Sequence, residues 1–255
     1  MSEEKIIKVA EKLAAGGGSV AFTGAGISVE SGIPDFRSAG GLWDKFDPME
    51  YATIEAFLRD PERVWEMLRE MDDLLKAAEP NPAHLALARL EQLGVLAGVI
   101  TQNVDNLHQR AGSREVIEFH GNGKRLVCLR CKRSLDAAEA HRRREEEFPP
   151  RCPDCRDILK PDVVFFGEPI PKAASIGAMR LAQSAPVMLV VGTSALVAPA
   201  SYLPVVAKKT GALIVEINRE HTVLTGDLAD VSLRGRAGEL LPRLVAAVEN
   251  AFGQA

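Results

Sequence analysis

The 255-residue sequence has no long run of lysine and arginine, and its formal net charge is only -4. Strong electrostatic binding to nucleic acid or to an anionic membrane is therefore not indicated. The sequence also has no apolar run long enough to span a bilayer, and residues 1–5 lack the basic and then apolar layout of a secretory signal. We therefore expect a cytoplasmic protein without direct membrane or nucleic-acid binding.

Cysteine is scarce, and in a reducing compartment the four cysteines are not expected to form disulfides. Cys128 and Cys131 form one Cys-x-x-Cys pair, and Cys152 and Cys155 form a second pair after residues 132–151. This spacing is typical of a four-cysteine zinc site. Because four thiolates leave no position for water, we predict one structural Zn²⁺, with a redox pair or a DNA-reading ribbon as the alternatives.

The composition, with 46% hydrophobic and 26% charged residues, is that of a globular protein, and 255 residues suffice for one large domain or for a large domain with a smaller insertion. Short apolar runs alternate with amphipathic stretches, which predicts an α/β fold: a parallel sheet, buried on both sides by helices. The expected strands are 20–23, 95–101, 116–120, 187–192, 213–218 and 231–233. Apolar residues at helical spacing predict helices over 6–13, 82–93 and 240–248.

Two segments interrupt this alternation. Residues 38–78 read as helices, with apolar side chains at helical spacing over 64–75, and residues 121–160 are rich in charge and proline and contain all four cysteines. We predict a discontinuous Rossmann-like domain, a helical module and a zinc-binding module. The domain is formed by 1–37, 79–120 and 161–255, and the modules are 38–78 and 121–160.

A glycine-rich turn follows the first predicted strand. Gly24 and Gly26 can adopt positive φ and leave no Cβ between the main chain and a nucleotide phosphate. However, Val29 occupies the place of the third glycine of a dinucleotide fingerprint, and no acidic residue follows a second strand at the usual distance. A tight turn without a ligand therefore remains the alternative.

Polar residues also follow the other predicted strands, at the carboxyl edge where open α/β sheets bind ligands. Gln102, Asn103 and Asp105 are suited to binding a ribose, an amide or an ordered water, or else Asn103 and Asp105 simply cap the next helix. His120 closes its strand as a candidate general base, although a single histidine is commonly structural. Further polar residues at strand ends, which ordinary turns would also explain, are Gly192, Thr193, Ser194 and Asn218.

A β-prone segment follows the predicted zinc module. If its edge is open, it can pair with an extended peptide; otherwise it is an internal strand. The segment consists of Val163, Val164, Phe165, Phe166, Gly167 and Glu168.

The order of these motifs is specific: GAGIS-x-x-x-GIPDFR, TQN-x-D-x-LH, HG, the paired Cys-x-x-Cys, FGE, GTS and EIN. Together they resemble the sirtuin family of NAD-dependent protein lysine deacylases, from residue 23 to at least residue 237. The chain looks like a compact bacterial or archaeal member without regulatory extensions.

The resemblance implies a Rossmann-like domain with a zinc-binding module and a helical module, and it implies that NAD and acyl-lysine enter the cleft between them from opposite sides. It implies that His120 is the catalytic base, that Asp105 holds the nicotinamide carboxamide, and that residues 163–168 bind the peptide. The remaining NAD contacts that it implies are Gly24, Ala25, Gly26, Ser28, Ile33, Asp35, Phe36, Arg37, Gln102, Asn103, Val104, Gly192, Thr193, Ser194 and Asn218.

The implied reaction removes the acyl group as 2′-O-acyl-ADP-ribose and releases nicotinamide. Relatives that remove succinyl and malonyl groups carry a tyrosine and an arginine after the residue that aligns with Trp65, whereas this chain has Leu68 and Met71. Because an apolar pair cannot compensate a buried carboxylate, we predict acetyl or longer apolar acyl groups, although both residues also suit simple packing. Protein ADP-ribosylation and a non-enzymatic zinc-ribbon binding protein remain the alternative functions.

Overall fold

The computed structural model describes residues 2–35 and 41–253, and the chain divides into two compact units. The first unit combines residues 1–35, 78–119 and 172–255, and the second combines residues 36–77 and 120–171. The first unit is therefore built from three separate stretches of chain, and its first and last helices pack against each other.

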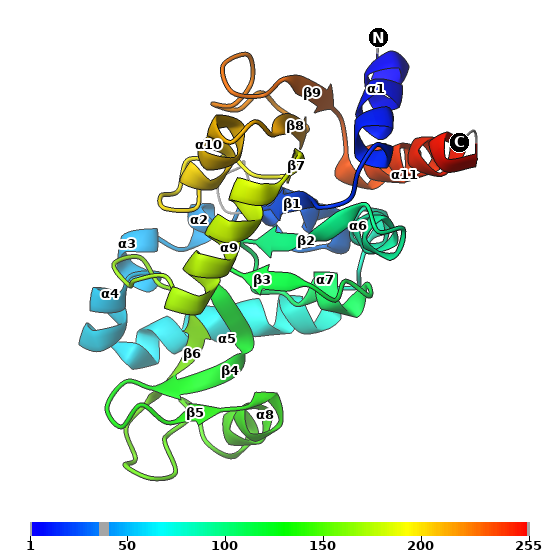
Figure 1. The fold of residues 1–255 in the computed structure, drawn as a ribbon. Helices are drawn as coiled ribbons and strands as arrows, with labels where there is room; N and C mark the ends of the chain where they lie inside the picture. The colour runs from blue at the N-terminus through cyan, green and yellow to red at the C-terminus, as the bar shows by residue number, and fades with distance from the viewer. Residues whose placement is uncertain (1, 36–40, 254–255) are drawn as a thin grey trace. The chain divides into compact units, whose positions relative to one another are not determined.

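A six-stranded parallel sheet forms the centre of the first unit, in the order β3-β2-β1-β7-β8-β9 (Figure 1). Every residue of β1 and β7 is buried, as the absence of polar alternation predicts for strands covered on both faces. The strands are β1 Ser19–Thr23, β2 Leu96–Thr101, β3 Val116–Glu118, β7 Val187–Val191, β8 Leu213–Asn218 and β9 Val231–Arg234.

Helices cover both faces of this sheet, which confirms the predicted fold class. α1, α6 and α11 pack together and share one hydrophobic core with alternate strand residues such as Ala21, Val99 and Leu189. α9 and α10 pack against each other and contact β2, β3, β7 and β8, and α9 crosses in front of the sheet in Figure 1. The helices are α1 Ser2–Ala14, α6 Pro82–Gln92, α7 Leu107–Arg110, α9 Lys172–Ser184, α10 Tyr202–Lys209 and α11 Ala237–Gly253.

The direction of strand addition reverses at the centre of the sheet. From β1 the chain adds β2 and then β3 on one side, and it later returns to place β7 against the other side of β1. Open parallel sheets bind ligands at such a switch point, beyond the carboxyl ends of the strands. Here that position belongs to the residues that follow Thr23 and Val191.

The second unit has a three-stranded antiparallel sheet in the order β5-β4-β6. Its helical and cysteine-containing parts share one hydrophobic core, in which the indole N–H of Trp65 donates to the carbonyl oxygen of Leu159 (2.8 Å). Residues 161–171 belong to this unit because β6 pairs with β4. Its elements are α2 Leu42–Lys45, α3 Pro48–Tyr51, α4 Ile54–Arg59, α5 Pro61–Ala77, β4 Gly121–Cys128, β5 Ser134–Leu135, α8 Ala137–Glu146 and β6 Leu159–Val163.

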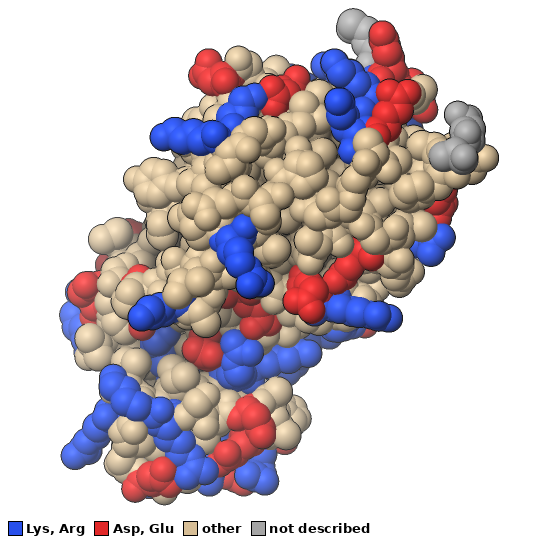
Figure 2. Space-filling view, in the orientation of Figure 1, with Lys and Arg blue, Asp and Glu red and all other residues tan. Residues whose placement is uncertain are grey.

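Basic and acidic side chains alternate over α8 on the face shown in Figure 2. Arg143 pairs with Glu146 (3.0 Å), and Arg151 and Arg156 both pair with Glu147 (3.4 and 3.0 Å). The charges of segment 142–147 are thus paired partly within the segment and partly with Arg151 and Arg156 outside it. Within residues 2–35 and 41–253, every helix is too short or too polar to span a lipid bilayer.

Candidate functional site

Two turns with glycine meet at the switch point of the parallel sheet. The N–H of Gly24 donates to the carbonyl of Val191 (3.1 Å), and that of Gly26 donates to the carbonyl of Gly192 (2.8 Å). A Cβ on Gly24 would lie 2.7 Å from the Cβ of Thr193, and one on Gly26 would lie 2.8 Å from the Cα of Gly192. These glycines therefore allow the two turns to pack backbone against backbone.

The backbone conformation at this point differs from the expectation. Gly24 has φ -131, and Gly26 is also outside the positive-φ region, whereas Gly192 has φ 60. The left-handed glycine is thus in the turn after β7, not in the turn after β1. Position 192 requires glycine because the two turns approach each other closely. A Cβ there would lie only 2.3 Å from the main-chain nitrogen of Ile27.

Side chains that follow β2 and end β8 tie these turns together. The Nε2 of Gln102 donates to the Oγ1 of Thr193 (2.9 Å), and the Nδ2 of Asn218 donates to the carbonyl oxygen of Thr193 (3.0 Å). The Nδ2 of Asn103 donates to the carbonyl oxygen of Gly24 (3.2 Å). The polar residues that the sequence assigns to separate strand ends therefore meet at one edge of the sheet.

A buried carboxylate lies at the centre of this edge. Asp105 is 7% exposed, and its Oδ2 accepts a hydrogen bond from the hydroxyl of Ser28 (2.7 Å). Its Oδ1 accepts from the main-chain N–H of Leu107 (2.9 Å), at the start of α7. The N-cap of α7 is Asn106, so Asp105 contacts the start of this helix without being its cap residue, while its second oxygen is oriented by Ser28.

The ring of His84 also contacts the hydroxyl of Ser28, although no motif in the sequence indicates this role. Its Nδ1 accepts from the main-chain N–H of Asn81 (3.3 Å), within the capping box that begins α6. The proton of the neutral ring therefore belongs on Nε2, which lies 3.4 Å from the Oγ of Ser28. The hydroxyl of Ser28 accepts from His84 and from Asn103 (3.1 Å) and donates to Asp105, so its hydrogen-bonding capacity is complete.

A second buried histidine extends this network. Thr23 donates to the Oγ1 of Thr101 (2.9 Å), so it accepts from the Nε2 of His108 (2.9 Å). The rings of His84 and His108 lie 4.9 Å apart in an edge-to-face arrangement. Burial lowers the pKa of His84 to about 4 against the opposing charge of Asp105, and burial together with His84 lowers the pKa of His108 far below its ordinary value. Both rings are therefore neutral near pH 7.

The other predicted NAD contacts of the first unit lie in the loops that follow β1, β2 and β7. Ile33 returns to Ser28 through a main-chain hydrogen bond (3.4 Å) after two short 3-10 turns, Ala25–Ile27 and Val29–Ser31. Asp35, Val104 and Ser194 are each partly exposed. The predicted contacts Phe36 and Arg37 lie outside the described residues.

Glu216 is a buried carboxylate at the end of β8, but it does not resemble the ribose-binding acid of a dinucleotide fold. It is 2% exposed and accepts hydrogen bonds from the hydroxyls of Thr222 (2.5 Å), Thr225 (2.6 Å) and Ser232 (2.8 Å). Its oxygens are therefore committed to holding the loop after Asn218 and the strand β9.

The four cysteines of the second unit form two matching knuckles. Cys128 accepts a main-chain hydrogen bond from Lys132 (3.0 Å), and Cys152 accepts the equivalent bond from Arg156 (3.0 Å). Lys132 and Arg156 both have positive φ, 64 and 62, so the two turns share one conformation. The knuckles bring together the Sγ atoms of Cys128, Cys131, Cys152 and Cys155.

The sulfur geometry fits a tetrahedral zinc ion. All four Sγ atoms lie within 4.8 Å of one another, with 3.4 Å between Cys128 and Cys155 and 3.5 Å between Cys131 and Cys152. Sulfur atoms about 2.3 Å from a metal at the corners of a tetrahedron would be separated by about 3.8 Å. Four thiolates complete the shell of Zn²⁺, which supports the predicted structural metal.

His120 begins the second unit, directly after β3 and Phe119. It lies in a turn and not in a strand, so the predicted strand 116–120 is two residues too long. Its side chain is partly buried, and its carbonyl oxygen accepts from the N–H of Val164 (2.8 Å). The main chain thus joins His120 to the predicted peptide-binding segment.

That segment is only partly a strand. β6 ends at Val163, and Phe166 forms a single parallel bridge with Thr53. Phe166 donates to the carbonyl of Ala52 (2.9 Å) and accepts from the N–H of Ile54 (3.0 Å). One edge of residues 163–168 is therefore already occupied by the segment before α4.

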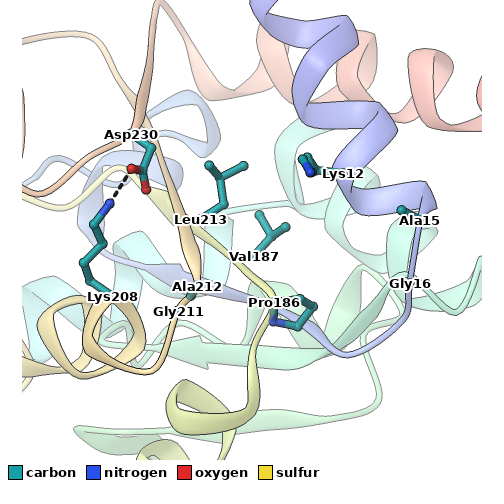
Figure 3. Close-up of a pocket in the computed structure, with 10 residues that line it drawn as sticks. All are labelled: Lys12, Ala15, Gly16, Pro186, Val187, Lys208, Gly211, Ala212, Leu213 and Asp230. Atoms are coloured by element: carbon teal, nitrogen blue, oxygen red, sulfur yellow. Dashed lines mark hydrogen bonds and ion pairs between the residues drawn. The ribbon is translucent and has the colours of Figure 1, made fainter.

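A cavity of about 560 Å³ lies at the opposite edge of the parallel sheet, where β7 and β8 begin (Figure 3). Of its three charged residues, Lys208 and Asp230 form an ion pair with each other, and the third is Lys12. It contains none of the predicted site residues, and the polar network at the carboxyl edge is the better candidate for chemistry. The cavity is lined by Lys12, Ala15, Gly16, Pro186, Val187, Lys208, Gly211, Ala212, Leu213 and Asp230.

Comparison with known protein families gives a match that covers most of the candidate site. Residues 24–199 match the model of the Sir2 family, which covers more than half of the chain. The chain belongs to the Sir2 family. The predicted resemblance is confirmed.

Individual members of the Sir2 family agree along almost the whole chain. A NAD-dependent protein deacylase of Pyrococcus abyssi is 50% identical over 242 residues, which cover 94% of this chain and 96% of that protein. A Sir2 homologue solved in complex with NAD is 45% identical with a TM-score of 0.87, covering 96% of this chain and 94% of that one. Sir2Af2 bound to a myristoylated histone peptide is 40% identical with a TM-score of 0.82, covering 99% and 100%.

Proposed function

We propose that this protein uses NAD to remove acetyl and other apolar acyl groups from lysine side chains of proteins. The observation that carries this proposal is the buried pair of Ser28 and Asp105 at the switch point of the parallel sheet, in a chain of the Sir2 family. A carboxylate whose position is held by a hydroxyl is suited to accept the N–H groups of the nicotinamide carboxamide. The homologue solved with NAD supports NAD as the co-substrate, and the relatives named as NAD-dependent protein deacylases support the reaction.

In the proposed reaction, Asp105 orients the nicotinamide, and the turns at Gly24 and Gly192 receive the pyrophosphate. The bond between nicotinamide and ribose breaks, and the acyl oxygen of the modified lysine forms a bond to C1′ of the ribose. His120 accepts the proton of a ribose hydroxyl, which then attacks the acyl carbon. Water completes the release of lysine and 2′-O-acyl-ADP-ribose.

We also propose roles for the remaining residues of the predicted site. Gln102, Ser194 and Asn218 bind ribose hydroxyls, and residues 163–168 bind the main chain of an acylated protein or peptide. The Rossmann-like domain binds NAD, while the helical and zinc-binding modules serve the peptide. We propose the cytoplasm as the location, because a four-thiolate zinc site requires reduced cysteines.

The proposed preference for apolar acyl groups depends on two side chains of α5. Leu68 packs against the core of the second unit, and Met71, one turn away, is partly buried. The packing role that the sequence left open therefore applies to Leu68. Neither side chain can bind a distal carboxylate, so the proposed preference for apolar acyl groups is retained.

One experiment tests the proposed function. The protein is incubated with NAD and with matched acetyl-, myristoyl- and succinyl-lysine peptides, and nicotinamide and acyl-ADP-ribose are followed by mass spectrometry. We expect both products from the apolar acyl peptides and little from the succinyl peptide. In His120→Ala we expect turnover to fall by at least a hundredfold with NAD binding retained. Equal turnover in the variant and the parent, or ADP-ribose attached to the peptide without deacylation, would refute the proposal.

A further inference from the structure

A buried lysine lies beneath the predicted peptide-binding segment. Lys160, the second residue of β6, is 2% exposed, although it ends the charge-rich segment 121–160. Lysine is seldom buried to this extent unless its charge is paired. Lys160 belongs neither to the zinc site nor to the predicted contacts with NAD.

The ammonium group of Lys160 has an acceptor for each of its three N–H bonds. It donates to the carbonyl oxygens of Pro161 (3.0 Å) and Val163 (2.6 Å), and it lies 2.9 Å from the Oε2 of Glu168. It also lies 4.4 Å from the centre of the Phe165 ring. Burial lowers the pKa of Lys160, and the hydrogen bond and charge of Glu168 oppose that effect.

Glu168 transmits this contact to the main chain. The same Oε2 accepts from the N–H of Phe165 (2.8 Å), and the N–H of Glu168 donates to the carbonyl of Phe165 (3.0 Å). From the other side, Phe166 is paired with Ala52 and Ile54. Residues 163–168 are therefore held from inside by one ion pair and from outside by the segment before α4.

We infer that Lys160 is a positioning residue for the acyl-lysine peptide, because it holds residues 163–168 in the conformation that the peptide meets. The inference rests on the proposed role of these residues in binding the substrate main chain. Such binding depends on the alignment of main-chain hydrogen bonds, and a segment that is already ordered loses less entropy when the peptide binds.

The choice of lysine follows from the geometry of the acceptors. Three separate oxygens converge on one small volume, which suits the compact ammonium group better than a planar guanidinium. A buried ion pair adds little net stability compared with an apolar pair of similar volume. Its contribution here is the selection of one main-chain conformation.

The first test compares Lys160→Met with the parent protein. We expect the KM for an acetyl-lysine peptide at saturating NAD to rise at least tenfold, while the KM for NAD at saturating peptide stays within twofold. Lys208→Met is the matched control, because it breaks a lysine–carboxylate pair in the other unit and should leave both values unchanged. Hydrogen exchange should show faster exchange of the Phe165 amide in Lys160→Met only.

A second variant separates positioning from folding. Lys160→Met leaves the carboxylate of Glu168 without its cation, whereas Lys160→Met combined with Glu168→Gln removes both charges and keeps an acceptor for the Phe165 N–H. We expect the double variant to regain most of the lost melting temperature but to keep a peptide KM at least fivefold above that of the parent. A parent-like peptide KM in this folded variant would overturn the inference. Failure of the parent protein itself to deacylate any peptide would instead refute the proposed function, and the inference with it.

Discussion

At the scale of single residues, the candidate site contains two buried neutral imidazoles, and one of them, that of His84, cannot accept a proton without disrupting a neighbour. His84 and His108 are buried, and each has a hydrogen bond that requires its proton on Nε2. If His84 gained a second proton on Nδ1, that nitrogen would face the N–H of Asn81, which can only donate. Burial alone therefore does not account for the preference for the neutral ring.

This arrangement predicts that acid destabilises the protein. The pKa of His84 is lowered from 6.5 to about 4, so the unfolded chain binds more protons than the folded one between these values. The stability that His84 contributes is present above pH 6.5 and is lost as the pH falls to 4. The loss is roughly 3 kcal/mol if the whole shift is expressed.

Urea unfolding at several pH values measures this effect. The pH dependence between 6.5 and 4 should be clearly shallower in His84→Gln than in the parent, because the amide does not titrate. His141→Gln, which changes an exposed histidine of α8, should behave like the parent. Identical slopes for His84→Gln and the parent would contradict the assignment of His84 as a buried neutral ring.

At the scale of elements, the contact between the turns after β1 and β7 determines the shape of the edge where we propose that NAD binds. Gly192 has φ 60, and the main chain of Gly26 and Ile27 occupies the space where its side chain would be. Gly211 also has positive φ, 99, but nothing lies within 4 Å of its missing Cβ. Substitution of Gly211 therefore tests backbone strain alone, whereas substitution of Gly192 tests strain together with a steric clash.

We predict that Gly211→Ala lowers the free energy of unfolding by about 1–2 kcal/mol, which is the cost of the left-handed conformation alone. Gly192→Ala should cost about 2–5 kcal/mol, because overpacking is added to that strain. Gly192→Ala should also weaken NAD binding, since the turn after β1 must move. Thermal unfolding and NAD titration measure both effects. Equal destabilisation by the two variants would show that the contact with Ile27 is unimportant.

At the scale of the whole molecule, the two units have separate hydrophobic cores, and only the second contains the cysteine cluster. Cys128 and Cys152 belong to the same hydrophobic cluster as Trp65 and Leu126. The metal site and the core of the second unit are therefore one structure, and we expect loss of Zn²⁺ to unfold that unit.

Metal removal should consequently act on one unit. With a strong chelator, we expect calorimetry to show an early transition for the second unit, while amides of β1, β2 and β7 stay protected in hydrogen exchange. Added Zn²⁺ should restore the calorimetric transition and the hydrogen exchange of the untreated protein. Cys128→Ser should show the same early transition in the absence of a chelator. A melting temperature that does not change after complete metal removal would contradict a structural role for zinc.

The parallel sheet, its helices and the zinc knuckles were predictable from the sequence because each depends on local patterns. Apolar runs without alternation predict buried strands such as β1 and β7, and the four cysteines form two turns whose spacing is set within a few residues. The edge residues Gln102, Asn103 and Asp105 were found because parallel strands bring their carboxyl ends together.

The sequence could not predict contacts between residues that are far apart along the chain. His84 occupies the buried face of a helix, where its spacing resembles that of any core residue, and only the fold places it under Ser28. Lys160 reads as one charge among many, and only the pairing of β4 with β6 buries it beside Glu168. Local pattern thus determined the elements and the reactive residue types. The tertiary structure decided which of them share a hydrogen bond or a charge, because these interactions depend on distances in space that sequence spacing does not encode.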